Sequence, residues 1–465
     1  MNNRTARDIR ARLGGNTDFK MRTFCVGKRR YDVFFLEGMA DAELLSRFVL
    51  EPLRCGEKAE ESALPYCDVS EAASTEEAVE GILRGKAALV ADRVLLFDVR
   101  RADKRTVEAP SEESAVMASK DSFVEDLKTN TVLLRKKIVS ENLRFEGRQI
   151  GRQTHTAVTL VYLNNIVNDA LLAHVRERLD RVDVDGVLTP DVLGQALQGK
   201  TRSAFPLTLT TERPDTVCRH LLAGHCAVLA DGLPIAYLLP AAMAQFMTTP
   251  GDFTGQNLFT SVVRLMRYAL IGVEVLLPGV YAAMTTFHYE MLPEKLALSI
   301  ASAKAGVPFP VLFELLAMLA LFEVLIEAGL HMPKSAGQAV SIVGALVVGE
   351  AAINADLVSP AALIIVAVSV ICSFAMPNQA LGNALRLWRV GITVAGALFG
   401  LFGVVSGAIV LLTRLASLAS FGVPYLAPLA GVGRIRLKET LLVMPDEEVK
   451  TRPEELRVKN RRRAR

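Results

Sequence analysis

Two uncharged stretches in the C-terminal third decide the fold class of this chain. They read LVSPAALIIVAVSVICSFAMPNQALGNAL (residues 357–385) and VGITVAGALFGLFGVVSGAIVLLT (residues 390–413). A helix needs about 20 apolar residues to cross a hydrocarbon core of about 30 Å, so both stretches predict membrane spans. The chain before about residue 255 is instead charged and patterned like a water-soluble α/β protein. We therefore expect a soluble half followed by a membrane half.

The composition fits this division and excludes several classes of protein. The 465 residues are 51% hydrophobic and 22% charged, which is too apolar for an ordinary soluble protein and too charged for a purely intramembrane one. No basic stripe interleaved with aromatic residues points to nucleic acid. The six cysteines have no CxxC spacing, so neither a disulfide framework nor a metal site is expected.

The first residues, MNNRTARDIRARLGGNTDFK, are polar and contain no apolar core. They do not have the pattern of a secretory signal. We expect residues 1–20 to be a flexible N-terminus and the soluble half to stay in the cytoplasm.

The soluble half contains one pattern twice. FFLEGMADAELL in the first copy matches VYLNNIVNDALL in the second, and RGKAALVADRVLLFDV matches AGHCAVLADGLPIAYLL. In each copy an amphipathic helix ends at a glycine and two strands follow around a turn containing Asp. We predict two related α/β subdomains, residues 21–140, ending in a connecting helix over residues 120–140, and residues 141–255. A duplicated binding lobe and a repeated scaffold without a pocket both fit this pattern.

The membrane half, residues 256–415, is expected to be all-α and polytopic, with four or five spans. Residues 268–287 form the first, and Arg264 and Arg267 place its N-terminal flank in the cytoplasm. Residues 337–353 and the two uncharged stretches are further candidates. Residues 311–328 carry Glu314 and Glu323 on opposite helix faces, which suggests an interfacial, re-entrant or bundle-buried helix.

The charged residues around the last spans give conflicting indications of their orientation in the membrane. The tail, residues 416–465, is basic, and 12 Lys and Arg follow Thr413, which indicates a cytoplasmic tail and an even number of crossings. Arg386 and Arg389 oppose four crossings, because that arrangement places them outside if residues 311–328 do not cross.

No catalytic signature is present. GxGxxG, the Walker lysine loop, HExxH and GxSxG are all missing, and the six histidines lack ligand spacing. His220 and His225 lie about 140° apart if a helix carries both, so we expect solvated or capping histidines. The sequence predicts a protein that is not an enzyme and has no cofactor or metal.

Small residues in the membrane half suggest two sites. Gly396, Gly400, Gly403 and Gly407 fall within roughly 60° of one helix face and predict close helix packing, the alternative being a flexible lipid-facing helix. Pore-lining candidates on a second slim face are Gly337, Ser341, Gly344 and Val348, followed by Glu350. In an oligomer Glu350 would form a cation-attracting ring. With Asn354 and Asp356 it equally fits a helix end at the interface, and Glu274 beside Pro278 has a similar ambiguity.

Five motifs resemble one family. They are TERPD (residues 211–215), AVLADGLPIAYLLP (227–240), LPEKLALSIASAKAGVPFP (292–310), GQAVSIVGALVVGEAAINADLVSP (337–360) and FGVPYLAPLA (421–430). Together they are similar to the A subunits of GerA-type spore germinant receptors, including the stage V sporulation protein AF relative. The family commonly has Gln at the position of Glu350.

The resemblance implies a multi-pass protein of the spore inner membrane. It implies a transporter-like B subunit and a lipoprotein C subunit as partners, and a homo-oligomer that conducts cations when nutrient is sensed. A non-conducting scaffold subunit and a secondary transporter are the alternatives.

Overall fold

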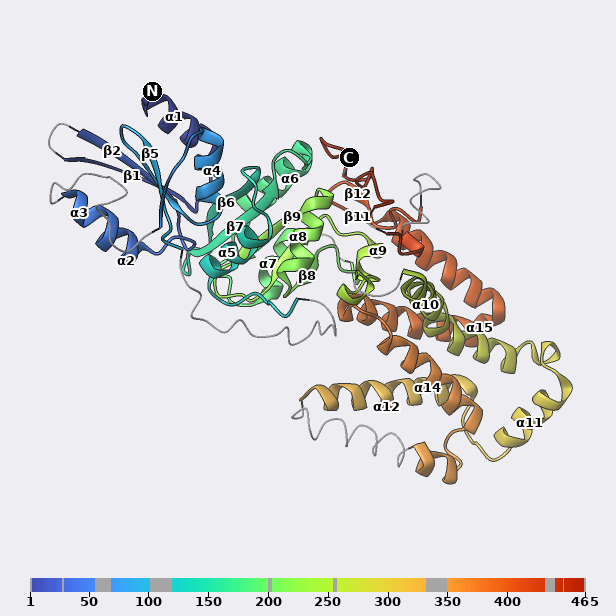
Figure 1. Cartoon of the computed structure of the whole chain (residues 1–465). Coiled ribbons are helices and arrows are strands. Elements are labelled where there is room, and N and C mark those ends of the chain that lie inside the picture. Colours follow the sequence, from blue (N-terminus) through green and yellow to red (C-terminus); the bar gives the residue numbers. More distant parts are fainter. Residues whose placement is uncertain are drawn as a thin grey trace.

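The computed structural model shows two α/β lobes followed by a helical domain (Figure 1). It describes residues 2–26, 29–54, 68–100, 119–199, 203–253, 257–331, 349–430, 440–445 and 447–463. We call residues 2–100 lobe 1, residues 119–253 lobe 2 and residues 257–417 the helical domain. The chain after residue 440 returns to lobe 2, so that N and C lie on different lobes.

The two lobes have the same strand order. In lobe 1 the sheet runs β1-β2-β4-β5-β3, and in lobe 2 it runs β6-β7-β9-β10-β8, with every neighbouring pair antiparallel. The lobe 1 strands are β1 (Phe19–Val26), β2 (Arg29–Leu36), β3 (Val69–Glu71), β4 (Ala87–Val90) and β5 (Val94–Phe97). The lobe 2 strands are β6 (Leu143–Ile150), β7 (Thr156–Leu163), β8 (Leu209–Thr211), β9 (Cys226–Ala230) and β10 (Ala236–Leu239). The predicted repeat is confirmed in the order of the strands.

Equivalent residues end and begin the helices of the two lobes. Asp41 accepts hydrogen bonds from the first amides of α2 (Ala42–Leu45), and Asn168 does the same for α6 (Asp169–Asp180). Gly85 and Gly224 have φ of 92° and 108° after their helices, a conformation that costs least at glycine. The matching sequence segments therefore form the same helix caps and turns in both lobes.

Helices cover both faces of each sheet. The other helices of lobe 1 are α1 (Asn2–Leu13), a π-helical turn (Ser46–Leu50), α3 (Glu51–Arg54) and α4 (Thr75–Leu83). Lobe 2 adds α5 (Leu127–Lys137), α7 (Pro190–Gln198), α8 (Pro214–Ala223) and α9 (Met243–Phe246). In lobe 1, α1 and α4 pack on one face and α2 and α3 on the other. In lobe 2, α5 and α8 pack on one face and α6 and α7 on the other.

The expectation of a flexible N-terminus differs from the structure. Residues 2–13 form α1, and Ile9 and Leu13 are buried in the core of lobe 1. Ala6, Ile9 and Leu13 have helical spacing, but the pattern is hard to detect because the other residues of α1 are polar or charged. Helix α5, predicted as a connector at the end of the first subdomain, packs in the core of lobe 2 as the counterpart of α1.

The helical domain begins after the turn η2 (Pro250–Phe253). Its elements are α10 (Asn257–Thr286), η3 (Tyr289–Met291), α11 (Glu294–Lys304), α12 (Val311–His331), α14 (Pro360–Phe374) and α15 (Gln379–Ser417). Among the described residues, α10 and α15 are the two helices long and apolar enough to cross a membrane. The count of four or five spans stays a prediction, and most of the candidate at 337–353 lies outside the described residues.

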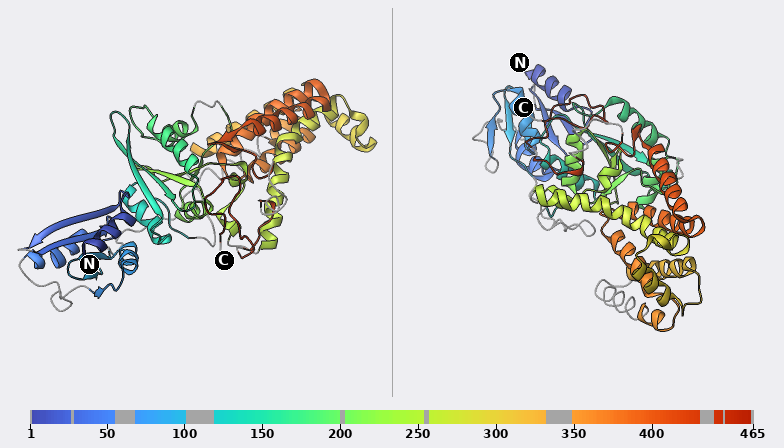
Figure 2. Two further views of the ribbon diagram at one scale, coloured as in Figure 1. Left: turned by 90° about the horizontal axis from the view of Figure 1, so that it is seen from above. Right: turned by 90° about the vertical axis from the view of Figure 1, so that its right-hand side faces the viewer.

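Helix α15 turns back on itself at Gly400. Gly400 has φ 64° and ψ −152°, which no helical residue adopts. A Cβ placed on Gly403 would lie 2.0 Å from Ala395 O, and one on Gly407 would lie 2.9 Å from Ile392 Cγ1. Residues 392–396 therefore pack against 403–407, and Figure 2 shows the two limbs side by side. The assumption of one helix with one glycine face is wrong, because a sharp turn lies inside an apolar run.

The outer faces of the helical domain are apolar and exposed. Large hydrophobic side chains on four helices are more than half exposed, including Leu258, Phe259, Val262, Phe313, Val324, Ile364, Ile371, Leu387, Phe399, Phe402, Val405 and Ile409. A soluble protein rarely exposes a contiguous apolar surface of this extent. This surface suits lipid or other protein chains.

Lobe 2 and the helical domain share one hydrophobic core. Phe145 and Leu229 of lobe 2 belong to the same buried cluster as Val275 of α10 and Ile392 of α15. The loop after α15 completes the junction. Tyr425 is fully buried, its ring lies 6.1 Å from that of Phe246, and its carbonyl accepts the Met243 amide at 2.7 Å. The short strands β11 (Ala419–Ser420) and β12 (Val423–Pro424) shape this loop.

Candidate functional site

The residues predicted to line a pore are mostly outside the described part of the chain. Gly337, Ser341, Gly344 and Val348 fall in the gap between 331 and 349. Glu350 lies in a helical stretch, residues 349–354, and its side chain is exposed. The prediction for these five residues stays open.

The four predicted packing glycines of α15 lie where other parts of the chain approach closely: Gly396 and Gly403 meet backbone oxygens, and Gly400 and Gly407 meet side chains. A Cβ on Gly396 would be 2.5 Å from Gly279 O of α10, and one on Gly279 would be 2.9 Å from Ile392 O. A Cβ on Gly400 would be 2.9 Å from His288 Nε2. Larger residues would force the limbs of α15 and helix α10 apart, the way small residues permit tight packing in membranes.

Charged residues of α10, α12 and α15 meet next to Ser369 of α14 in the helical domain, and we call these residues the polar cluster. Arg389 of α15 is buried, and its Nη2 lies 2.9 Å from Glu323 Oε1 of α12. Arg386 Nη1 lies 3.5 Å from the other oxygen of Glu323. Arg386 and Arg389 thus have an internal partner instead of marking an outer flank. The Glu323 side chain is itself 41% exposed, so the interfacial, re-entrant and bundle-buried interpretations of residues 311–328 all stay predictions.

The polar cluster continues to the kink of α10. Pro278 has no amide hydrogen, so the carbonyl of Glu274, four residues earlier, loses its helical donor. Ser369 Oγ of α14 donates to this carbonyl at 2.7 Å, and Arg389 Nη1 donates to Ser369 Oγ at 3.4 Å. One chain of hydrogen bonds therefore joins α10, α14 and α15.

Glu274 is the unusual member of this cluster. Its side chain is fully buried, and neither carboxylate oxygen has a hydrogen-bond partner among the described residues. Arg389 and Arg386 are the cations that act on it. Buried ionisable groups in membrane helices are costly and usually serve function. Two arginines and two glutamates would make the cluster electrically neutral.

Glu314, unlike Glu274, has hydrogen-bond partners. Its Oε2 accepts from the amide and hydroxyl of Ser359 at 3.2 and 2.9 Å, at the start of α14. Lys304 Nζ lies 3.6 Å from its other oxygen. A carboxylate at a helix N-terminus is favoured by the unpaired amides there. Glu314 thus joins α12 to the beginning of α14.

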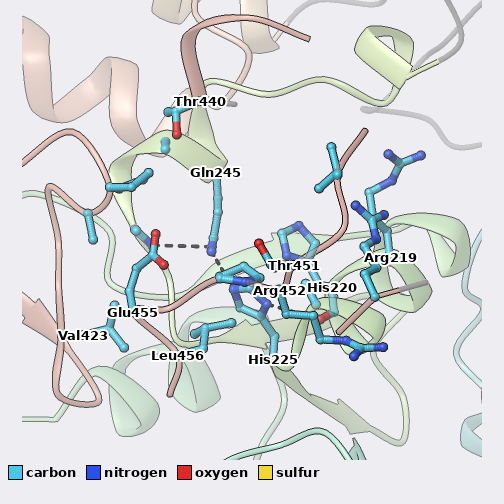
Figure 3. Close-up of a pocket in the computed structure, with 18 of the residues that line it drawn as sticks. Arg219, His220, His225, Gln245, Val423, Thr440, Thr451, Arg452, Glu455 and Leu456 are labelled. Atoms are coloured by element: carbon cyan, nitrogen blue, oxygen red, sulfur yellow. Dashed lines mark hydrogen bonds between the residues drawn. The ribbon is translucent and has the colours of Figure 1, made fainter. Parts of the chain in front are cut away.

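A cavity of about 280 Å³ lies where lobe 2, the start of α10 and the tail meet, and we call it the junction cavity (Figure 3). Its walls come from α8, α9, η2, α10, the loop after α15 and residues 440–463. Arg452 of the tail donates to Leu222 O at 2.7 Å, and Lys459 N donates to Ile166 O at 2.9 Å, so the tail is held against lobe 2. The cavity is closed by segments that are far apart in sequence.

Two histidines and a glutamine form one wall of the junction cavity. Helix α8 ends at Ala223, and the turn at Gly224 brings the rings of His220 and His225 to 4.8 Å, edge to face. His225 Nδ1 bonds His220 O at 3.2 Å, and Gln245 Nε2 lies 2.6 Å from His225 Nε2, as Figure 3 shows. Burial lowers the pKa of His225 to about 4, so this ring is neutral near pH 7. Of the two expectations, solvated or capping histidines, the first is wrong for His225, which is buried, whereas its bond to His220 O in the last turn of α8 is a capping contact.

The start of α10 is tied to lobe 2 by a buried ion pair. Asp252 accepts from Arg267 Nη1 at 2.8 Å and from Thr249 Oγ1 at 2.7 Å, while Arg264 Nη2 lies at 3.4 Å. Burial disfavours the Asp252 carboxylate, but the bonds from Arg267 and Thr249 hold its pKa below the usual value. Arg264 and Arg267 therefore serve as internal partners where lobe 2 meets the helical domain.

Sequence reasoning missed Ser369, the buried contact of Arg264 with Asp252, and the pairing of Arg389 with Glu323. The signal for Ser369 was Pro278, which frees a carbonyl that some donor must satisfy. The signal for the ion pairs was the presence of both charge signs in apolar helices. No cluster of three or more potential metal ligands occurs among the described residues.

Comparison with known proteins identifies the family of this chain. Residues 7–455 match the family described as Bacillus/Clostridium GerA spore germination protein. The chain belongs to the GerA family. It is 33% identical to spore germination protein KA of Bacillus subtilis over 96% of this chain and 85% of that protein. It is 32% identical to spore germination protein GerLA of Bacillus cereus over 98% of this chain and 95% of that protein.

One solved structure is also similar to this GerA protein. It is the N-terminal domain of the A subunit of the Bacillus megaterium spore germinant receptor GerK3, with 26% identity and a TM-score of 0.40. The similarity covers 51% of this chain and 93% of that one.

Two of the five sequence motifs have clear structural roles here. In TERPD, Arg213 is buried, bonds Asp215 through Nη2 at 2.7 Å, and donates to Ser119 O at 2.8 Å, with Pro214 as the first residue of α8. FGVPYLAPLA is the loop that carries Tyr425 into the core of lobe 2. Both motifs hold the scaffold together at lobe 2.

Proposed function

We propose that this GerA protein is the A-type subunit of a spore germinant receptor. In this proposal it sits in the spore inner membrane with lobes 1 and 2 in the cytoplasm. It assembles with copies of itself and passes cations when a transporter-like B subunit senses nutrient, with a lipoprotein C subunit as further partner. It carries out no catalytic chemistry. The family match over residues 7–455 is the observation that carries the receptor role.

The helical domain supports the membrane part of the proposal. Its outer faces are apolar, whereas the buried Arg389 contacts Glu323 and Ser369 on neighbouring helices, and the buried Glu314 contacts Ser359. Charges that are neutralised between helices are compatible with lipid outside. Glu350 is exposed next to α14, so several copies can bring this carboxylate together.

The arrangement of lobe 2 bears on the number of crossings. Lobe 2 holds the entry to α10 through Asp252 and Arg267, and the exit from α15 through Met243 and Tyr425. A chain that enters and leaves on the same side crosses an even number of times. This arrangement supports four crossings over five.

Planar bilayer recordings of the purified protein test conduction. We expect steady single-channel currents. Glu350→Gln should reduce the preference for cations, so that the reversal potential in a KCl gradient moves toward zero. Glu448→Gln, which removes an exposed carboxylate of the tail, is the matched control and should leave the reversal potential unchanged. Silence would favour a scaffold subunit, and saturable flux a transporter.

A second test uses spores. Ser341→Trp should stop ion release while the protein remains in the membrane fraction, because an indole would obstruct a narrow pore. Normal release in this variant would contradict the pore assignment.

A further inference from the structure

The junction cavity has the make-up of a binding site. Most of its wall is apolar, with side chains such as Ala223, Pro240, Ala244, Val423 and Leu456, and a few polar groups converge on it. Ligand sites in proteins commonly combine an apolar wall with few, well-placed polar groups. A volume of about 280 Å³ limits the ligand to a small molecule or to one end of a larger one.

The charge of the lining favours an anion. Four arginines (Arg219, Arg264, Arg452 and Arg463) and one carboxylate (Glu455) are among the described lining residues. The imidazole of His225 is neutral and fully engaged by Gln245 and the His220 carbonyl. The positive charge of the cavity therefore comes from guanidinium groups, which suit carboxylate or phosphate oxygens.

Arg264 has a buried N–H donor that is not used in a hydrogen bond among the described residues. It is 4% exposed, and its Nε has no hydrogen-bond partner among the described residues. Its contact with Asp252 is long, at 3.4 Å, because Asp252 is already bonded by Arg267 at 2.8 Å. A buried donor without an acceptor is rare in folded proteins and indicates a missing partner.

We propose that the junction cavity binds an oxyanion carried on a small apolar body, with Arg264 as its main charged contact. The oxyanion belongs either to a soluble organic acid or to the headgroup of an anionic lipid. Such a ligand would touch α8 of lobe 2, helix α10 and the tail at once. Its binding would hold these three segments together and stabilise the folded protein.

Thermal unfolding of the full-length protein in neutral detergent tests this site without reference to ion conduction. Benzoate is the probe, and benzamide, of the same shape but uncharged, is its control. We expect the melting temperature to rise with the logarithm of benzoate concentration above saturation and to be unaffected by benzamide. Inorganic phosphate and micelles containing phosphatidylglycerol, compared with phosphatidylcholine, form the other two arms.

Variants connect the effect to the cavity. Ala244→Leu fills the cavity without removing a hydrogen bond, and Arg264→Gln removes the charged contact; both should abolish the shift. Ala173→Leu, on the exposed side of α6, is the matched control and should keep it. A shift with benzoate assigns a soluble acid, and one with phosphatidylglycerol alone, lost in Ala244→Leu, assigns a lipid. Equal shifts with benzoate and benzamide, shifts that survive Ala244→Leu, or no shift in any arm would overturn the proposal.

Discussion

Lobes 1 and 2 have one topology but different relations to the rest of the molecule. The α1 and α4 face of lobe 1 closes over its own core, which contains Ile9, Phe34 and Ile82. The equivalent face of lobe 2, covered by α5 and α8, continues without interruption into α10 and α15. The same fold therefore forms a core of its own in lobe 1, whereas in lobe 2 it shares its core with the helical domain.

The contact between the lobes is largely polar. Asn16 and Thr17 bond the backbone of Phe145 on the edge strand β6, and Asp18 accepts two hydrogen bonds from Arg135 at 2.9 and 3.2 Å. Arg135 also lies over the Phe145 ring at 4.6 Å. Lobe 1 thus covers the open edge of the lobe 2 sheet. Arg144 also bonds the carbonyls of Arg12 and Gly14, and Lys128 pairs with Glu37, but no hydrophobic cluster of the described residues is shared by the two lobes. The attachment is therefore easier to disrupt than either core.

The largest expected effect comes from truncating one buried ring in each lobe. Phe246→Ala in lobe 2 and Phe97→Ala in lobe 1 should each lower stability by about 3–5 kcal/mol through cavity formation. Hydrogen exchange by mass spectrometry should show faster exchange in lobe 2, α10 and α15 for Phe246→Ala, and in lobe 1 alone for Phe97→Ala. Spread of the Phe97→Ala effect into the helical domain would contradict the comparison.

The contact between the lobes should be next in size. Arg135→Gln leaves Asp18 buried without its partner, which costs about 3 kcal/mol or more. The amide of Thr17 should lose protection from exchange while both cores keep theirs. Lys128→Gln is the control, because its pair with Glu37 is exposed and contributes less than about 1 kcal/mol. Equal effects of both variants would remove the case for Arg135 as the main link.

Two equivalent helix-cap substitutions, one in each lobe, should have a smaller effect on stability. Asp41→Ala and Asn168→Ala should each cost about 1 kcal/mol, since each removes the side chain that accepts the first helical amides. Asn168 also donates to Leu456 O at 3.3 Å. Asn168→Ala should therefore speed exchange in residues 447–463, and Asp41→Ala should not. If the tail is unaffected in both, its docking does not depend on lobe 2 at this point.

The smallest expected effect is a pH dependence confined to lobe 2. Burial disfavours the Glu146 carboxylate, but bonds from Arg176 at 2.5 Å and from Tyr162 prevail and lower its pKa. A lowered pKa contributes stability that is present above the ordinary value of about 4.3 and is lost as the pH falls through the folded value. Lobe 2 should weaken in this acid range, and Glu146→Gln should reduce the dependence. An unchanged pH profile in that variant would exclude Glu146.

Local patterns were predictable from sequence, and long-range pairings were not. The repeated FFLEGMADAELL and VYLNNIVNDALL segments predict strand and capped helix because Asp41, Asn168, Gly85 and Gly224 act on neighbouring residues. Glu323 and Arg389 are 66 residues apart, and nothing in either segment specifies the other. Hydropathy also does not show whether an apolar stretch is one straight helix or two helices joined by a turn. The turn at Gly400, inside an uncharged stretch, could therefore not be predicted.

The docking of Tyr425 and Leu456 into lobe 2 imposes an order on biogenesis. A ribosome makes lobe 2 before it makes any helix of the membrane half, yet part of the lobe 2 core consists of residues that emerge after α15. Newly made lobe 2 must wait with an apolar face uncovered while the helices insert. Chains whose helices fail to insert would keep that face open to chaperones and proteases, so quality control is coupled to insertion.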